Sequence, residues 1–170
     1  WYSANMNYYT VAGLMAIESS FIPFPSEIVV PPAAAVSVLP GSKMNIILII
    51  LFATIGSLIG ALVNYFLSMT LGRTIIYKFA DSKLGHLCLL NSDKIRKAEN
   101  YFNDHGKVST FIGRLIPGIR QLISIPAGLA RMPLFSFMGF TVLGAGIWNV
   151  VLALIGYIVG DNMDLFYKYF

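Results

Sequence analysis

The sequence has little charge and almost no cysteine. Only 12% of its 170 residues are charged, whereas soluble domains average ~25%. Cys88 is the single cysteine, so an internal disulfide is excluded. Residues 1–7 lack the basic segment of a cleavable signal peptide, and we expect no such signal there. The scarcity of charge argues against an ordinary soluble domain.

Long apolar runs are present instead. Residues 44–72 and residues 132–160 contain no charged side chain, and each run is longer than the ~20 residues that a membrane-spanning helix needs. Hydrophobic residues make up 56% of the chain. This pattern predicts an all-α integral membrane protein, with a single membrane domain over residues 1–170.

Basic residues gather between the two runs. Lys and Arg near the ends of spanning helices favour the cytoplasmic side, so we expect the linker 73–107 to be cytoplasmic. Nucleic-acid binding is set aside, because acids lie among the basic residues and membrane segments flank the linker. Within it, residues 93–105 have the apolar spacing of an interfacial amphipathic helix. The basic residues are Arg73, Lys78, Lys83, Lys94, Arg96, Lys97 and Lys107.

Proline interrupts two other apolar stretches. Ile-Pro, eight residues and Pro-Ala occur at 22–33 and again at 116–127, an offset of 94 because 116 − 22 = 94. Each broken stretch precedes one long run, which predicts two repeats, about 8–70 and about 108–160. We expect Ser26 to cap the helix after the first break. Because proline lacks an N–H donor, we expect helix breaks at Pro23 and Pro25 and at the Pro117-Gly118 pair.

Two topologies fit the broken stretches. As re-entrant hairpins, each enters and leaves on one membrane face, each repeat crosses once, and the repeats are inverted. As kinked spanning helices, each repeat crosses twice and the copies run parallel. Length favours hairpins, because the pieces beside the breaks are ~14–21 Å long at ~1.5 Å per residue, about half a bilayer. The expected fold is an inverted repeat of a re-entrant helix hairpin plus a transmembrane helix, with interfacial amphipathic helices between the repeats. A GxxxG spacing, which allows close helix packing, occurs in each long run: Gly56 with Gly60, and Gly156 with Gly160.

Four ionisable residues flank the breaks. Glu18 and Glu27 flank the first, and Arg114 and Arg120 flank the second. A charge at the bilayer centre is unfavourable by at least ~2.5–3.5 kcal/mol, so the four need partners or a water-filled cavity. Mutual pairing is one explanation. The other is a transport site, because guanidinium groups bind phosphate bidentately and a buried carboxyl can carry a proton. We expect the two arginines to bind substrate and the two glutamates to couple protons.

Little in the sequence points to catalysis. No His or Cys lies in the apolar segments, and the acids lack metal-ligand spacing. We therefore predict no enzyme, no metal and no cofactor. His86 and His105 fall in the polar linker and are expected to be solvated. Trp148 is interpreted as ordinary membrane packing, and Asn64 and Asn149 as buried polar residues that bond between helices or line a cavity.

The residues around both breaks resemble a known family. The chain is similar to the DedA family, also called the VTT or SNARE-associated Golgi protein family. It departs from the family at Ala61, where members often carry an acid. The resemblance implies two facing re-entrant hairpins, with the acids at Glu18 and Glu27 and the arginines at Arg114 and Arg120. It also implies the family's helix breaks, which match Pro23, Pro25, Pro117, Gly118 and Pro126. The matching stretches are ESSFIPFPSEIVVPPAA at 18–34, GRLIPGIRQLISIPAGLARMPL at 113–134, LGR at 71–73 and WN at 148–149.

The same resemblance implies a function. It points to a flippase- or scramblase-like lipid transporter that moves a phospholipid or a polyprenyl phosphate, such as undecaprenyl phosphate, between leaflets with proton coupling. It implies a multi-pass protein of a bacterial cell (inner) membrane, whose partners are an anionic membrane lipid and protons. A homo-oligomer is compatible with the sequence. A small-ion or proton antiporter, a channel, and a non-transporting membrane assembly factor stay open as alternatives.

Overall fold

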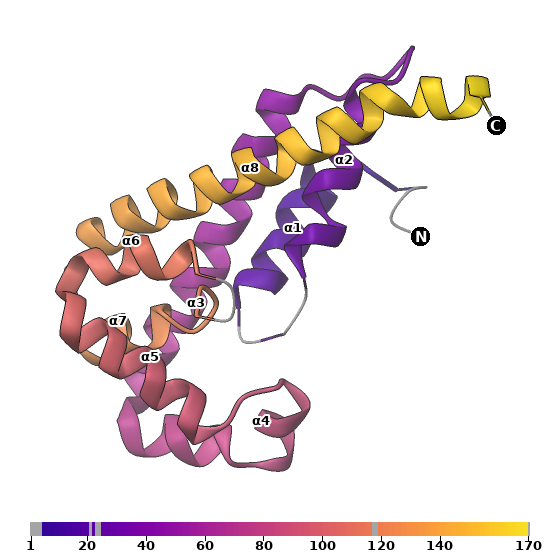
Figure 1. Ribbon diagram of the computed structural model, residues 1–170. Coiled ribbons are helices and arrows are strands. Elements are labelled where there is room, and N and C mark those ends of the chain that lie inside the picture. Colours follow the sequence, from indigo (N-terminus) through magenta and orange to yellow (C-terminus); the bar gives the residue numbers. More distant parts are fainter. Residues whose placement is uncertain (1–4, 21, 23–24, 117–118, 170) are drawn as a thin grey trace.

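The computed structural model describes residues 5–20, 22, 25–116 and 119–169, with side chains up to Asn162. Every regular element in these residues is helical, which confirms the all-α prediction for the described part (Figure 1). Two helices are long, α3 (Ile46–Ala80) and α8 (Leu134–Tyr169). The short elements are α1 (Tyr8–Ser19), η1 (Ser26–Ile28), α2 (Val30–Ser37), α4 (Lys83–Leu87), α5 (Ser92–His105), η2 (Gly106–Val108), α6 (Ser109–Arg114) and α7 (Ser124–Leu129).

Both long helices suit a membrane. Ile46–Ala80 and Leu134–Asn162 are long and apolar enough to cross one. Large apolar side chains on them face outward, with Ile47 64% and Ile158 60% exposed. Such a surface is unfavourable in water and suits lipid. The two helices run in broadly opposite directions (Figure 1).

Glycine allows the first pair of short helices to approach the long ones. A Cβ atom at Gly56 or Gly60 of α3 would lie 2.2 Å from a carbonyl oxygen of α1. A Cβ atom at Gly156 or Gly160 of α8 would lie 2.2 or 2.6 Å from a carbonyl oxygen of α2. Both GxxxG predictions are therefore confirmed as close helix contacts.

The second pair of short helices packs on other parts of the same long helices. A Cβ atom at Gly128 of α7 would lie 2.3 Å from the carbonyl oxygen of Tyr65, farther along α3 than the α1 contact. Gly144, near the start of α8, lies against α6 at Arg114. Each long helix thus packs mainly on one short helix of each pair. The chain between α1 and α2 contacts the chain between α6 and α7 through Glu27 and Arg120.

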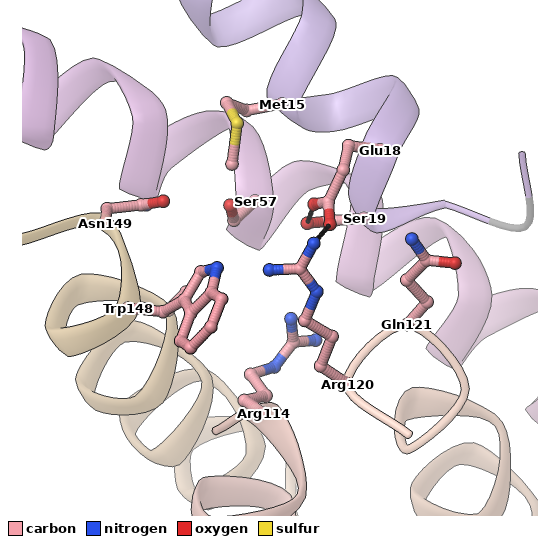
Figure 2. A pocket seen from close by; sticks show the side chains of 10 residues that line it. Met15, Glu18, Ser19, Ser57, Arg114, Arg120, Gln121, Trp148 and Asn149 are labelled. Atoms are coloured by element: carbon pink, nitrogen blue, oxygen red, sulfur yellow. Dashed lines mark hydrogen bonds and ion pairs between the residues drawn. The ribbon is translucent and has the colours of Figure 1, made fainter. Parts of the chain in front are cut away.

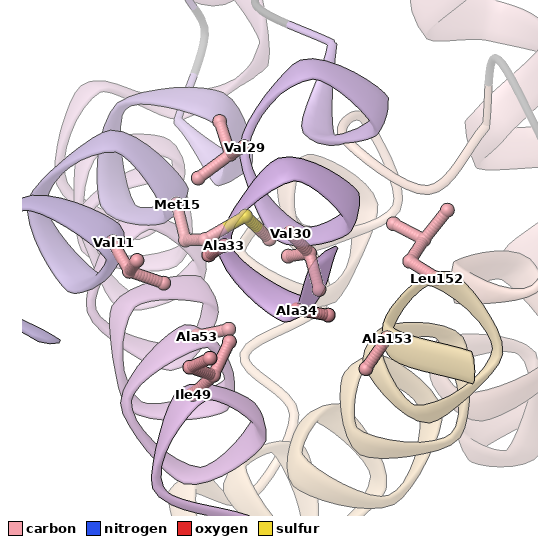
Figure 3. Packing of buried hydrophobic residues seen from close by; sticks show 10 residues of the cluster. All are labelled: Val11, Met15, Val29, Val30, Ala33, Ala34, Ile49, Ala53, Leu152 and Ala153. Carbon is pink, nitrogen blue, oxygen red and sulfur yellow. The ribbon is translucent and has the colours of Figure 1, made fainter. Parts of the chain in front are cut away.

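One apolar cluster joins α1, α2, α3 and α8 (Figure 3). Most of its members are alanine or valine, so the helix backbones lie close together. Small side chains at such contacts are typical of helix packing in membranes, where close approach replaces the hydrophobic driving force. The buried members are Val11, Met15, Val29, Val30, Ala33, Ala34, Ile49, Ala53, Leu152 and Ala153.

The segment between the two repeats is largely helical. At Gly72 of α3, φ is 75° and ψ is 171°, a conformation that favours glycine, and the helix kinks there. Beyond the kink, Arg73 pairs with the buried Glu99 of α5 at 2.8 Å, and the Tyr77 hydroxyl donates to the same carboxylate. The predicted amphipathic helix is confirmed as α5, whose buried residues are Ile95, Ala98, Glu99 and Phe102.

Asp81 joins the end of α3 to the start of α5. The Ser92 hydroxyl donates to Oδ2 of Asp81, and the Ser92 backbone N–H donates to Oδ1 at 3.0 Å. These hydrogen bonds stabilise the ionised carboxylate. They lower the pKa of Asp81 below its ordinary value, the hydroxyl contributing most.

Candidate functional site

The first helix break lies between α1 and α2. Helix α1 ends at Ser19, and the backbone at Pro25 is extended. The prediction that Ser26 caps the next helix is wrong, because Ser26 begins a single 3₁₀ turn, and α2 starts only at Val30 with no side-chain cap. Prolines occupy the first turn of α2, where their missing N–H has no intrahelical acceptor to satisfy.

The second break lies between α6 and α7. Helix α6 ends at Arg114 and α7 begins at Ser124, with turns between them. The expectation of a helix break at Pro126 is wrong, because this residue stands in the first turn of α7. Pro32 has the equivalent place in α2, so the two repeats match at this position. The expected breaks at Pro23, Pro117 and Gly118 lie outside the described residues.

Arg120 connects the two breaks. Its guanidinium lies 2.9 Å from the carboxylate of Glu18 and 3.5 Å from that of Glu27. Figure 2 shows the Arg120 side chain reaching Glu18 across the space between the elements. The side chains of Glu18 and Arg120 are 4% and 12% exposed, whereas that of Glu27 is 51% exposed. One cation therefore faces two acids, and only the contact with Glu18 is buried.

Arg114 lies beside this pair but is bound differently. Its Nη2 donates to the hydroxyl of Ser124 at 2.8 Å, and its buried Nε has no hydrogen-bond partner among the described residues. Gly144 makes room for the side chain, since a Cβ there would lie 2.9 Å from Cβ of Arg114. Mutual pairing, the first explanation for these charges, thus holds for Arg120 and not for Arg114.

Trp148 of α8 covers the paired arginine. The guanidinium carbon of Arg120 lies 5.1 Å from the indole centroid, a cation–π contact. The indole N–H donates to the hydroxyl of Ser26 at 3.4 Å. The interpretation of Trp148 as ordinary packing is therefore wrong. The WN dipeptide at 148–149 is the sequence signal that could have identified Trp148 as a residue of the site.

Two asparagines bond across the site, as expected of them. The amide of Asn64 in α3 donates to the carbonyl of Ser19 and to that of Gln121, both at 3.3 Å, so it links one break to the other. The amide of Asn149 donates to the hydroxyl of Thr54 at 3.2 Å. Sequence reasoning missed Gln121, because its backbone carbonyl makes this contact and residue type does not reveal it.

A small cavity lies among these groups. Its volume, measured as the space open to the centre of a water-sized sphere, is about 20 Å³. This is enough for about one water molecule. A whole phosphate group does not fit in this arrangement. The cavity is lined by Met15, Glu18, Ser19, Ser57, Arg114, Arg120, Gln121, Ala145, Trp148 and Asn149 (Figure 2).

The histidines and acids do not form a metal site in the described part of the chain. No group of three or more His, Cys, Asp or Glu side chains there is placed to hold an ion. His86 and His105 are exposed, as predicted. Nδ1 of His105 lies 2.9 Å from the carbonyl oxygen of Tyr101 at the end of α5.

Comparison with known proteins identifies the family of this chain. Residues 20–158 match the VTT domain. An "Alkaline phosphatase-like protein" of Lactococcus lactis is 42% identical over 158 residues, 93% of this chain and 73% of its own. "Undecaprenyl phosphate transporter A" of Staphylococcus aureus is 32% identical over 162 residues, 95% of this chain and 78% of its own. "Protein DedA" of Escherichia coli is 24% identical over 155 residues, 88% of this chain and 67% of its own. No solved structure matches the chain.

The names of these relatives bear on enzymatic activity. The Staphylococcus relative is named as a transporter, and the Lactococcus name states only a likeness to a phosphatase. These names agree with the prediction that the chain is not an enzyme. The matched residues 20–158 include both helix breaks and most of both long helices. The chain belongs to the VTT-domain family of membrane proteins, also called the DedA family.

Proposed function

We propose that this protein moves a lipid phosphate, such as undecaprenyl phosphate or a phospholipid, between the leaflets of a bacterial cell membrane and couples this movement to protons. The observation that carries the proposal is the contact of Arg120, from one break, with Glu18 and Glu27 from the other. The names of the Staphylococcus and Bacillus subtilis relatives, both undecaprenyl phosphate transporter A, support this class of substrate.

In this proposal the broken stretches are re-entrant hairpins that face each other in the bilayer. The arms α1, α2, α6 and α7 contain 12, 8, 6 and 6 residues. At ~1.5 Å per residue these lengths are ~9–18 Å, less than the ~30 Å hydrocarbon core. The first hairpin packs on the beginning of α3 and the end of α8, and the second packs on the opposite parts. Because α3 and α8 run in broadly opposite directions, this packing supports hairpins that enter from opposite faces.

Cysteine labelling tests the hairpin topology. Single cysteines replace Ser3 and Ser42, on either side of the first hairpin, and Lys97 in the linker, all in a Cys88→Ser chain. An impermeant thiol reagent should label the first two positions from one membrane face and position 97 from the other. Labelling of positions 3 and 42 from opposite faces would reject the inverted repeat in favour of kinked spanning helices.

The proposed proton coupling follows from competition between the lipid headgroup and Glu18 for Arg120. An anionic headgroup accepts charge-assisted hydrogen bonds from Arg114 and Arg120. Glu18 then loses its cationic partner in a buried place, and a buried carboxyl without a cation favours its neutral form. It therefore takes up a proton when the lipid binds. When the lipid leaves, Arg120 returns to Glu18 and the proton is released.

Transport into liposomes tests the coupling. Movement of a labelled polyprenyl phosphate is followed with and without an imposed pH gradient. The gradient should accelerate transport by the natural chain but not by Glu18→Gln, in which the side chain is permanently neutral. Gradient-driven transport by a folded Glu18→Gln variant would contradict the coupling role. The Glu18 carboxylate would then be only a structural partner of Arg120. Proton flux in the absence of any lipid phosphate would instead indicate the small-ion antiporter.

A further inference from the structure

Helix α8 presents an unpaired hydrogen-bond acceptor at the cavity. Asn149 is 1% exposed, and its Oδ1 has no hydrogen-bond partner in the part of the chain that the structure describes. Figure 2 shows this oxygen directed toward Ser57 and the space beside Trp148. A buried polar atom without a partner is unfavourable and uncommon in folded proteins. A group that donates a hydrogen bond in the cavity would satisfy it.

Thr54 fixes which end of the amide faces the cavity. The Thr54 hydroxyl has one proton, which it donates to the carbonyl of Ile50 at 2.8 Å. Its oxygen can therefore only accept from Asn149, and it accepts from Nδ2 at 3.2 Å. A flipped amide would place two acceptors against each other. The unpaired Oδ1 is thus a consequence of the hydrogen-bond network and not of an arbitrary choice between nitrogen and oxygen.

The other polar groups at the cavity define what ligand fits. Arg120 supplies a guanidinium, and Arg114 supplies a second one whose Nε is unpaired in the described structure. A phosphodiester offers only acceptor oxygens, so it satisfies the arginines and leaves Oδ1 of Asn149 unpaired. A phosphate monoester that retains one proton offers acceptors and one P–OH donor. Such esters lose that proton near pH ~6, so the singly protonated form is abundant in mildly acidic solution.

We propose that Asn149 is a specificity-determining residue that selects a lipid phosphate monoester, in its singly protonated form, over a phosphodiester. This inference rests on the proposed transport function and narrows its substrate class. The P–OH group donates to Oδ1 of Asn149, while the anionic oxygens accept from Arg114 and Arg120. The cavity of about 20 Å³ admits a hydroxyl group but not a whole phosphate. The headgroup therefore enters only when Arg120 parts from Glu18.

Two probes of equal charge test the selection. Binding to the purified full chain is measured at pH ~5, where a C15 polyprenyl phosphate and its methyl ester are both monoanions and only the first has a P–OH group. The natural chain should prefer the monoester by about tenfold, which corresponds to ~1.4 kcal/mol. Asn149→Leu keeps a similar shape without the acceptor. It should weaken monoester binding by the same factor and leave methyl-ester binding unchanged.

Two further variants serve as controls for folding and orientation. Thr141 is another buried residue of α8 with an unpaired hydroxyl in the described structure, and it is not among the residues that line the cavity. Thr141→Val should leave the affinity for both probes unchanged. Thr54→Val removes the acceptor that orients Asn149, so the amide can turn and the preference for the monoester should fall.

The outcomes separate this inference from the transport proposal. Equal affinity of the natural chain for the two probes would overturn the selection, whether or not any variant folds. An equal loss for both probes in Asn149→Leu would also overturn it and assign Asn149 a structural role. In both cases the transport proposal stands if Arg114→Ala with Arg120→Ala abolishes binding of both probes. A natural chain that binds neither probe would reject both ideas.

Discussion

Two clusters of opposed charges among the described residues differ in how completely their hydrogen bonds are matched. The linker cluster consists of Arg73, Tyr77 and Glu99. The junction cluster consists of Glu18, Glu27, Arg114 and Arg120. In the linker cluster the acid is 7% exposed and accepts from both other members. In the junction cluster one arginine faces two acids, and the other keeps a buried N–H without a partner among the described residues.

This difference separates charged residues that stabilise the fold from charged residues that bind a ligand. A buried acid that already has its donors gains little from a ligand, and losing those donors destabilises the fold. Buried charges that lack full partners are unfavourable unless a ligand compensates them at some stage. We therefore expect the linker cluster to hold α5 against α3. We expect the junction cluster to bind the lipid phosphate and to release it.

Removal of both junction arginines should have the largest effect. Hydrogen bonds to charged groups contribute ~1.5–3 kcal/mol each, so Arg114→Ala with Arg120→Ala should weaken polyprenyl phosphate binding by ~100-fold or more. Arg73→Ala in the linker cluster is the matched control and should leave affinity unchanged. Affinity is measured on detergent-purified variants. An unchanged affinity in a folded double variant would remove the arginines from the binding site.

A lysine series sharpens the same comparison. Lysine keeps the positive charge but lacks the planar fork that binds phosphate bidentately. Arg114→Lys and Arg120→Lys should therefore each lose affinity, but less than the alanine variants. Full affinity in both would mean that charge alone attracts the lipid.

The two junction acids should differ from each other. Glu18 is buried and lies 2.9 Å from Arg120, whereas Glu27 is half exposed at 3.5 Å. Exposed ion pairs contribute only ~0–1 kcal/mol. Glu18→Gln should therefore abolish gradient-driven transport in liposomes, and Glu27→Gln should only reduce it. The reverse order would move the proton-coupling group to the exposed side of the junction.

Local features of the sequence predicted much of this arrangement. The charge-free runs identified α3 and α8, and apolar spacing identified α5. The proline repeat located both helix breaks, which lie between α1 and α2 and between α6 and α7. The four junction charges also stood out, since charge is rare in apolar segments. Each of these signals depends on neighbours along the chain.

Other features depend on contacts between distant residues and were missed. The first repeat was expected to end at about residue 70, and the helical geometry of α3 is interrupted at Gly72. The turns from Arg73 to Ala80 were not predicted, and they pack on α5. The hydroxyl of Ser26 accepts from Trp148 instead of capping a helix. The sharing of one arginine by two acids follows from packing on α3 and α8, which no local pattern encodes.

Loss of the linker acid should affect stability more than transport. Glu99→Gln removes the charge that holds Arg73 and Tyr77, at a free-energy cost of roughly 1–2 kcal/mol, since Arg73 is largely exposed. The melting temperature in detergent should fall, while transport per folded molecule is retained. Lost transport with an unchanged melting temperature would place this cluster on the transport path and break the comparison.

Substitution of Asp81 should have the smallest effect on the melting temperature, and only at a pH where its carboxyl group is ionised. Hydrogen bonds from Ser92 lower its pKa from the ordinary value of 3.8 in the folded state. A lowered folded pKa contributes stability that is present above 3.8 and is lost as the pH falls through the folded value. Asp81→Asn should therefore melt slightly below the natural chain at pH ~7, and the difference should vanish in acid. Ser92→Ala should remove part of the same contribution, so the double variant should lose less than the sum of the two single losses. Additive losses would mean that Asp81 and Ser92 do not act through each other, and the link from α3 to α5 would then depend on the linker cluster and the apolar packing beside it.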